Sequence, residues 1–137
     1  MLALSLFVLA GCGQGGPAAA IEGTQKAAEF KKGQGLLLTP EAMTFIGLRQ
    51  AEAQAGGERL LVPAQALLRT SEGSFVFVQN GQRWLRTPVK AVAATAGTLQ
   101  VAEGLLEGDV VAVAGVWDLW LAELQATKGG VGCADGH

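Results

Sequence analysis

The chain has 137 residues, of which 50% are hydrophobic and 16% are charged, and this composition is typical of a folded protein rather than a disordered one. Its formal net charge of −2 excludes the basic surface field that binds a nucleic-acid backbone. The 20 glycines and the lack of tyrosine favour many turns and few long helices. The two cysteines lie near opposite ends, which is not the pattern of a disulfide framework, so each needs its own explanation.

The N-terminus has the features of a lipoprotein signal. Residues 2–10 form an apolar run that is shorter than the roughly 20 residues needed to span a bilayer and matches a signal-peptide h-region. Leu9-Ala10-Gly11-Cys12 resembles a bacterial lipobox, in which the peptide is cut before the cysteine and the thiol takes a diacylglycerol. No Lys or Arg precedes the run. We predict a signal peptide over residues 1–11 and lipidation at Cys12, with a buried cysteine in an N-terminal strand as the alternative.

Residues 12–34 are predicted to be a flexible tether, because residues 13–29 are rich in Gly, Ala and Gln. A lipid on Cys12 would place the protein in the periplasm, anchored to the cell membrane or to the outer membrane. Gly13 stands where aspartate is the usual inner-membrane retention residue, which favours the outer membrane.

The folded part is predicted to cover residues 35–127. Thr39-Pro40-Glu41 begins a helix well, with Thr as the N-cap and Pro in the first turn, and Gly47 can end it. We expect strands at residues 36–38, 46–53, 60–63, 75–78, 83–89, 92–94, 99–101 and 110–113, a loop at 54–58 and one short helical turn at 64–68.

A hairpin is predicted at Asn80-Gly81, because both residues tolerate positive φ and apolar runs flank them. In the return strand, Trp84 and Arg86 share one face, and Pro88 marks a sheet edge. Near the C-terminus, apolar residues at helical spacing predict a closing helix whose stripe packs on the core: Trp117, Trp120, Leu121 and Leu124. Residues 128–137 are predicted to be a flexible tail.

These elements predict a mainly β fold, a small antiparallel β-roll or barrel-like domain with one or two short helices. Within it, residues 104–115 read as a turn, a short buried strand and a second turn, punctuated by Gly104, Gly108 and Gly115. No residue in this stretch is a candidate for catalysis, so the stretch helps to identify the type of domain and does not form a site.

Three blocks in this order resemble the membrane-proximal domain of periplasmic adaptor subunits, the HlyD-like membrane fusion proteins of RND-type efflux pumps. They are Leu38-Thr39-Pro40-Glu41 with Ile46-Gly47-Leu48-Arg49, then Val62-Pro63-Ala64-Gln65-Ala66-Leu67 with Phe75-Val76-Phe77-Val78, and finally residues 104–115 with the closing helix. The family carries a lipoyl-like sandwich, a helical hairpin and a β-barrel between the first two blocks, whereas only residues 54–59 lie there in this chain. The resemblance therefore covers the membrane-proximal domain alone.

The resemblance implies a lipid-anchored, truncated adaptor that docks on an RND-type inner-membrane pump and takes part in transmembrane transport of metal ions or drugs. The missing hairpin is the part that contacts the outer-membrane channel, so this protein should not bridge two membranes. The resemblance leaves a homo-oligomer open.

Catalytic chemistry is not expected. His137 is the single histidine and the last residue, which leaves no catalytic triad and no two-histidine metal site elsewhere. No Gly-rich loop follows a strand and opens a helix, so there is no phosphate cradle. We therefore do not expect an enzyme.

The C-terminal tail contains the one group of side chains in the sequence that could act together as metal ligands. Cys133, Asp135 and His137 lie within five residues and could weakly hold a soft or borderline metal ion. Tails of the heavy-metal subgroup of adaptors look similar. This leaves two further hypotheses open, a periplasmic metal-binding lipoprotein and a gene remnant with no present role; a solvated tail is the simpler explanation of these residues.

Overall fold

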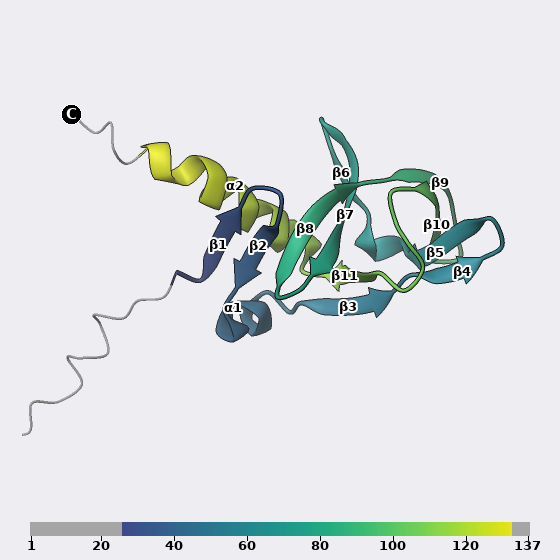
Figure 1. The fold of residues 1–137 in the computed structure, drawn as a ribbon, viewed down its shortest axis with the longest axis horizontal. Helices are drawn as coiled ribbons and strands as arrows, with labels where there is room; N and C mark the ends of the chain where they lie inside the picture. Colours follow the sequence, from purple (N-terminus) through teal and green to yellow (C-terminus); the bar gives the residue numbers. More distant parts are fainter. Residues whose placement is uncertain (1–25, 133–137) are drawn as a thin grey trace, which may run out of the picture.

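The computed structural model describes residues 26–132, which form two antiparallel sheets and two α-helices (Figure 1). In chain order the elements are β1 (Ala28–Lys31), β2 (Gly35–Leu38), α1 (Pro40–Phe45), β3 (Arg49–Glu52), β4 (Gln54–Gly56), β5 (Arg59–Pro63), the 3-10 turn η2 (Ala64–Ala66), β6 (Leu68–Thr70), β7 (Gly73–Asn80), β8 (Arg83–Pro88), β9 (Lys90–Thr95), β10 (Thr98–Glu103), β11 (Val110–Ala114) and α2 (Val116–Gly132).

The first sheet has the order β1-β2-β8-β7-β11-β3, with β6 also paired to β7, and the second has the order β4-β5-β10-β9. The mainly β, antiparallel fold predicted from the sequence is confirmed. Within residues 26–132 both sheets keep free edges, so this part of the chain forms an open fold rather than a closed barrel.

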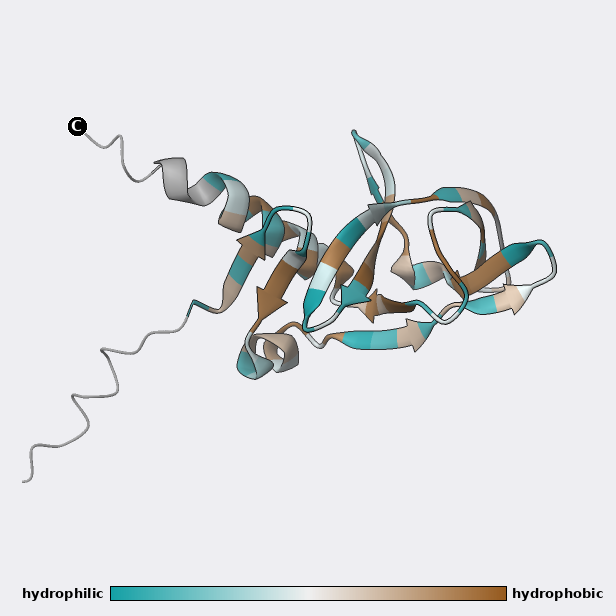
Figure 2. Ribbon diagram, in the orientation of Figure 1, coloured by the Kyte–Doolittle hydropathy of each residue, from teal (hydrophilic) through white to brown (hydrophobic). Residues whose placement is uncertain are grey.

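Two buried clusters lie on opposite faces of the first sheet. The helix-side cluster joins that sheet to α2 and consists of Leu36, Leu38, Leu68, Phe77, Trp84, Ala112, Val116 and Leu119. The sheet-side cluster joins the two sheets and consists of Ala53, Val62, Ala66, Val76, Leu99, Val101, Leu105 and Val111. Figure 2 shows strongly hydrophobic residues gathered on inner strands such as β2 and β11. Because successive residues of a strand point to opposite faces, Val76 and Phe77 are both fully buried, each in a different cluster.

The start of α1 follows the sequence prediction. The Thr39 hydroxyl accepts a hydrogen bond from the Ala42 backbone N–H at 3.2 Å, and Pro40 occupies the first turn. The chain leaves the helix at Gly47, whose φ of +64° is a conformation that glycine adopts without strain. From there it enters β3 at one edge of the first sheet.

The Asn80-Gly81 hairpin also forms as predicted. It connects β7 to β8, with Asn80 opposite Arg83. Strand β2 pairs with β8 only near Trp84, so the Pro88 end of β8 has β7 as its neighbour on one side, and this is where a strand tolerates proline.

Four local predictions differ from the structure. The helical turn expected at residues 64–68 covers only Ala64–Ala66, and the chain then forms β6. Residues 28–31, placed in the tether, form β1, because their apolar residues Ala28 and Phe30 alternate with charged ones and pack on the helix-side cluster. Residues 54–56, expected to be a loop, form β4 and pair with β5 around Gly57. Helix α2 continues to Gly132, beyond the predicted domain end at residue 127. Glycine costs a helix only about 1 kcal/mol per residue and does not by itself end one.

Candidate docking surface

The residues predicted to carry lipid or metal lie outside the described residues: Cys12 in the N-terminal part, and Cys133, Asp135 and His137 after α2. Between residues 26 and 132, no three His, Cys, Asp or Glu side chains are grouped in a way that could hold a metal ion. No helix in this part of the chain is long and apolar enough to cross a membrane.

The conformation of residues 104–115 is fixed by a positive φ at Gly104 and by the hydrogen bonds of Asp109. Gly104 has φ +108°, and a Cβ there would overlap the carbonyl oxygen of Pro88. The Asp109 carboxylate accepts a hydrogen bond from the Leu106 N–H at 2.8 Å, and the Asp109 carbonyl accepts one from Ala53 at 2.7 Å. Asp109 therefore closes the turn and ties it to the end of β3, which is a structural role.

Helix α2 turns a different face to the core from the one predicted. Its buried residues are Val116, Leu119 and Glu123, which share a face at helical spacing. The predicted core stripe lies to one side of them. Trp117 and Leu121 are 57% and 51% exposed, while Trp120 and Leu124 are half-buried and Trp120 packs against the helix-side cluster as predicted.

The four residues of this displaced stripe form the aromatic face of α2: Trp117, Trp120, Leu121 and Leu124. The rings of Trp117 and Trp120 meet edge to face, with centroids 5.2 Å apart and an interplanar angle of 73°. Exposed large apolar side chains of this kind are enriched at protein interfaces. The aromatic face is therefore a candidate docking surface.

A polar contact joins the core side of α2 to the first sheet. Arg86 on β8 donates a 2.9 Å hydrogen bond from Nε to Glu123 Oε1 and a 3.1 Å bond from Nη1 to the Glu72 carboxylate. Its guanidinium also lies 4.5 Å from the ring centroid of Phe75. Burial opposes the charge of Arg86, but the bonds and charges of Glu72 and Glu123 outweigh it and raise the pKa of Arg86 above its ordinary value.

Sequence reasoning missed this pair, although a signal for it was present. A carboxylate at the position of Glu123, seven residues after Val116 and four after Leu119, falls in line with the helix's buried residues. A buried carboxylate needs a cationic partner, and Arg86 lies on the same strand face as Trp84, which packs on α2 through the helix-side cluster.

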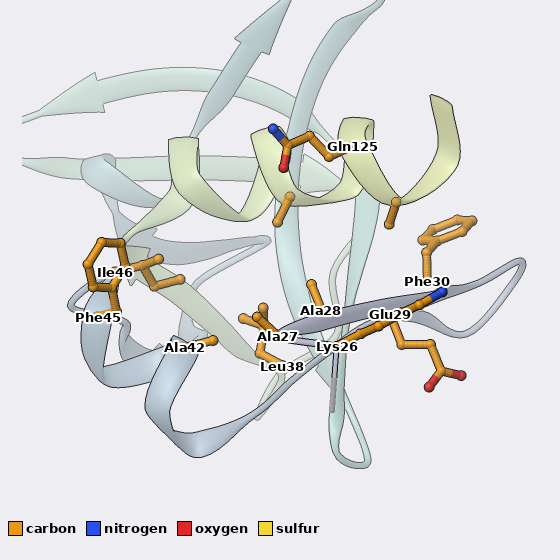
Figure 3. A pocket seen from close by; sticks show the side chains of 12 residues that line it. Lys26, Ala27, Ala28, Glu29, Phe30, Leu38, Ala42, Phe45, Ile46 and Gln125 are labelled. Atoms are coloured by element: carbon orange, nitrogen blue, oxygen red, sulfur yellow. The ribbon is translucent and has the colours of Figure 1, made fainter. Parts of the chain in front are cut away.

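A groove of about 590 Å³ runs between β1, α1 and α2 (Figure 3). Its lining includes residues 26–30, Ala42 and Phe45 from α1, and Ala122 and Ala126 from α2. Phe45 stands at its rim and is 91% exposed. Alanines make up much of the wall, so the groove has room for an extended segment with small side chains.

Similarity to known proteins is found among solved structures. No family model matches the chain, and no curated protein matches it. Among solved structures, the chain is similar to the NMR structure of a 180-residue part of SilB from Cupriavidus metallidurans CH34, which holds the N-terminal metal-binding site and the membrane proximal domain of that protein. The identity is 35% and the TM-score is 0.46, and the match covers 54% of this chain and 44% of that chain.

The chain therefore matches less than half of that 180-residue part of SilB.

Proposed function

We propose that the protein is a non-enzymatic, adaptor-like module of a metal-efflux system, tethered in the periplasm by a lipid on Cys12 and docked on an RND-type pump. The observation that carries this proposal is the short connection between the first and the second adaptor-like block. Strand β3 ends at Glu52, and the β4–β5 hairpin begins two residues later at Gln54. The three adaptor-like blocks are thus joined within one small fold.

The same connection limits the role. Where adaptors of the resembled family carry the domains that reach the outer-membrane channel, this chain has a hairpin that turns at Gly57. The proposed protein therefore acts at the pump and does not form a bridge between membranes. The 35% identity to SilB over part of the chain supports the broader proposal of an adaptor-like role in metal efflux.

Docking is proposed to use the aromatic face of α2, where Trp117 and Leu121 are more than half exposed. The test is co-purification of the tagged full chain with the candidate pump from membranes in mild detergent. The wild type should retain the pump, and the double variant Trp117→Ser, Leu121→Ser should lose it. Leu106→Ser, which removes an apolar side chain that is 74% exposed in another part of the fold, is the matched control and should retain it.

Failure of the wild type to retain the pump contradicts docking. Equal retention by all three proteins contradicts the use of the aromatic face. Lipidation is tested separately by the mass of the mature protein, which in the wild type should include a diacylglycerol and in Cys12→Ser should not.

A second candidate function is metal binding by the tail. Helix α2 continues to Gly132, the residue before Cys133, so the predicted ligands begin directly after a helix.

A further inference from the structure

The outer edge of β1 is an unused pairing surface. Within residues 26–132, β1 pairs with β2 and with no other strand. The Thr39 N–H donates to the Ala27 carbonyl at 3.1 Å, which makes residues 27 and 39 a hydrogen-bonded pair. Such pairs alternate along an antiparallel ladder. The N–H and C=O groups of Ala28 and Phe30 therefore point away from β2, toward the open edge.

The groove runs along this edge. Residues 26–30, five in succession, line it, although alternate residues of a strand point to opposite faces. A groove that touches all five therefore follows the backbone edge rather than one face of the sheet. Figure 3 shows Ala28 and Phe30 pointing toward α2, whereas the Glu29 side chain points away. A strand edge beside a helix, with an apolar groove between them, is the arrangement that accepts an added strand.

We propose that the protein's own residues 17–21 occupy this groove as an added antiparallel strand next to β1. The chain outside the described part ends at Gln25, and Lys26 already lines the groove. In the proposed arrangement residues 22–25, which include Gly23, serve as a four-residue hairpin loop, one of the common lengths. This loop places residue 21 opposite residue 26, residue 19 opposite residue 28 and residue 17 opposite residue 30.

The side chains of the segment suit that register. Ala19 and Ile21 fall on the face that Ala28 shares with α2, where Ala122 and Ala126 leave room. Ala18 and Ala20 fall on the outer face with Ala27 and Glu29, both exposed. Pro17 comes last, opposite Phe30; it has no N–H to donate to the Phe30 carbonyl, so the added strand ends there.

The segment has an advantage over a second copy of the chain. A four-residue connection gives it an effective concentration in the millimolar range, which a free partner must exceed. Paired in this way, residues 17–21 cover the exposed edge of β1, the kind of edge that otherwise invites pairing between molecules.

Amide hydrogen exchange on the full chain tests the proposal, with three proteins compared. In the wild type the Ala28 amide should exchange at least about tenfold more slowly than an unpaired amide, independently of protein concentration. Ala19→Asp, which puts a carboxylate into the groove, should abolish that protection. Ala20→Asp, which puts the same group on the outer face, should keep it. The Phe77 amide should stay protected in all three and so report that the domain is folded.

Three results would overturn the proposal. These are an unprotected Ala28 amide in the wild type, protection that is equal in both variants, and protection that disappears on dilution, which would assign the edge to a second copy. Because none of these measurements involves a pump or a lipid, their outcome is independent of the proposed function.

Discussion

Arg86 on β8 and Glu123 on α2 are joined by a 2.9 Å hydrogen bond that fixes the closing helix on the sheet. The Glu123 side chain is only 9% exposed, and its second oxygen, Oε2, has no hydrogen-bond partner among the residues that the structure describes. The pair lies on the side of α2 that faces the core, together with Val116 and Leu119, whereas Trp117 and Leu121 stay exposed.

Removing the carboxylate should destabilise the domain. Glu123→Ala leaves the half-buried guanidinium without its buried partner, and we expect a loss of about 1–3 kcal/mol in the free energy of unfolding by urea denaturation. Glu72→Ala removes the other partner of Arg86, which is 66% exposed, and should cost less than about 1 kcal/mol. Equal losses would show that Glu123 is no more important than a surface ion pair.

The pair should be insensitive to alkaline pH. A cation whose pKa is raised in the folded state stabilises the fold fully below its unfolded pKa, and the effect is lost only as pH rises through the folded pKa. For Arg86 the pKa is raised from an ordinary value that already lies above the alkaline range tested, so the coupling between residues 86 and 123 should be equal at about pH 7 and about pH 11. In Arg86→Lys it should be weaker at about pH 11, because lysine has an ordinary pKa of about 10.4.

Double-mutant cycles in urea at the two pH values measure that coupling. If the coupling energy of the wild-type pair falls between about pH 7 and about pH 11 as strongly as that of the lysine variant, Arg86 is not held in its charged form.

Two glycines of the turn at residues 104–115 should respond differently to alanine. Both have positive φ, which costs a non-glycine residue roughly 1–2 kcal/mol. At Gly108 the nearest atom to a new Cβ is Glu52 Oε1 at 3.7 Å, so the φ penalty is the main effect expected. At Gly104 the new Cβ would overlap the Pro88 carbonyl oxygen, so Gly104→Ala should cost at least about 3 kcal/mol. Thermal and urea unfolding of the two variants would check the order, and equal losses would contradict it.

The rotation of α2 can be tested by truncating its two faces. Leu119 is fully buried, so Leu119→Ala should cost about 2–5 kcal/mol. Trp117→Ala removes an exposed ring and its contact with Trp120, and we expect about 0.5–1.5 kcal/mol. The two variants are compared by urea unfolding. A larger loss of stability in Trp117→Ala than in Leu119→Ala would instead support the core stripe that the sequence predicted.

Metal binding by the tail gives the last prediction. If the tail holds an ion, Cys133→Ser should lose most of the Zn²⁺ or Cu⁺ binding seen by calorimetric titration, because the thiolate is its softest ligand. Thr127→Ser, a mild change earlier in α2, is the control and should bind as the wild type does. Negligible binding by the wild type would rule out this function.

The strands of the folded core were largely predictable because local signals and packing agree there. Asn80-Gly81 required a hairpin, and Leu99 and Val101, predicted as a strand, are both buried. Strand β1 was missed because it is four residues long and its order depends on pairing with β2, which composition does not reveal.

The α2 face was mispredicted for a related reason. Hydrophobic spacing favoured the larger side chains Trp117 and Trp120, whereas the actual core side includes a carboxylate whose partner lies 37 residues earlier in the chain. The spacing of apolar residues along a helix carries no information about an ion pair with a distant element. The predicted lipid and metal residues stay predictions, because they lie outside the described part of the chain.

Val76 and Phe77 make β7 a support for both layers of the fold. Each is fully buried, one against the second sheet and the other against α2, so the same strand backbone supports both layers. If either layer were to open, it would expose one face of β7 and weaken the strand that supports the other. The described residues should therefore unfold in a single cooperative step, and a protease that reaches one layer should release fragments of both together.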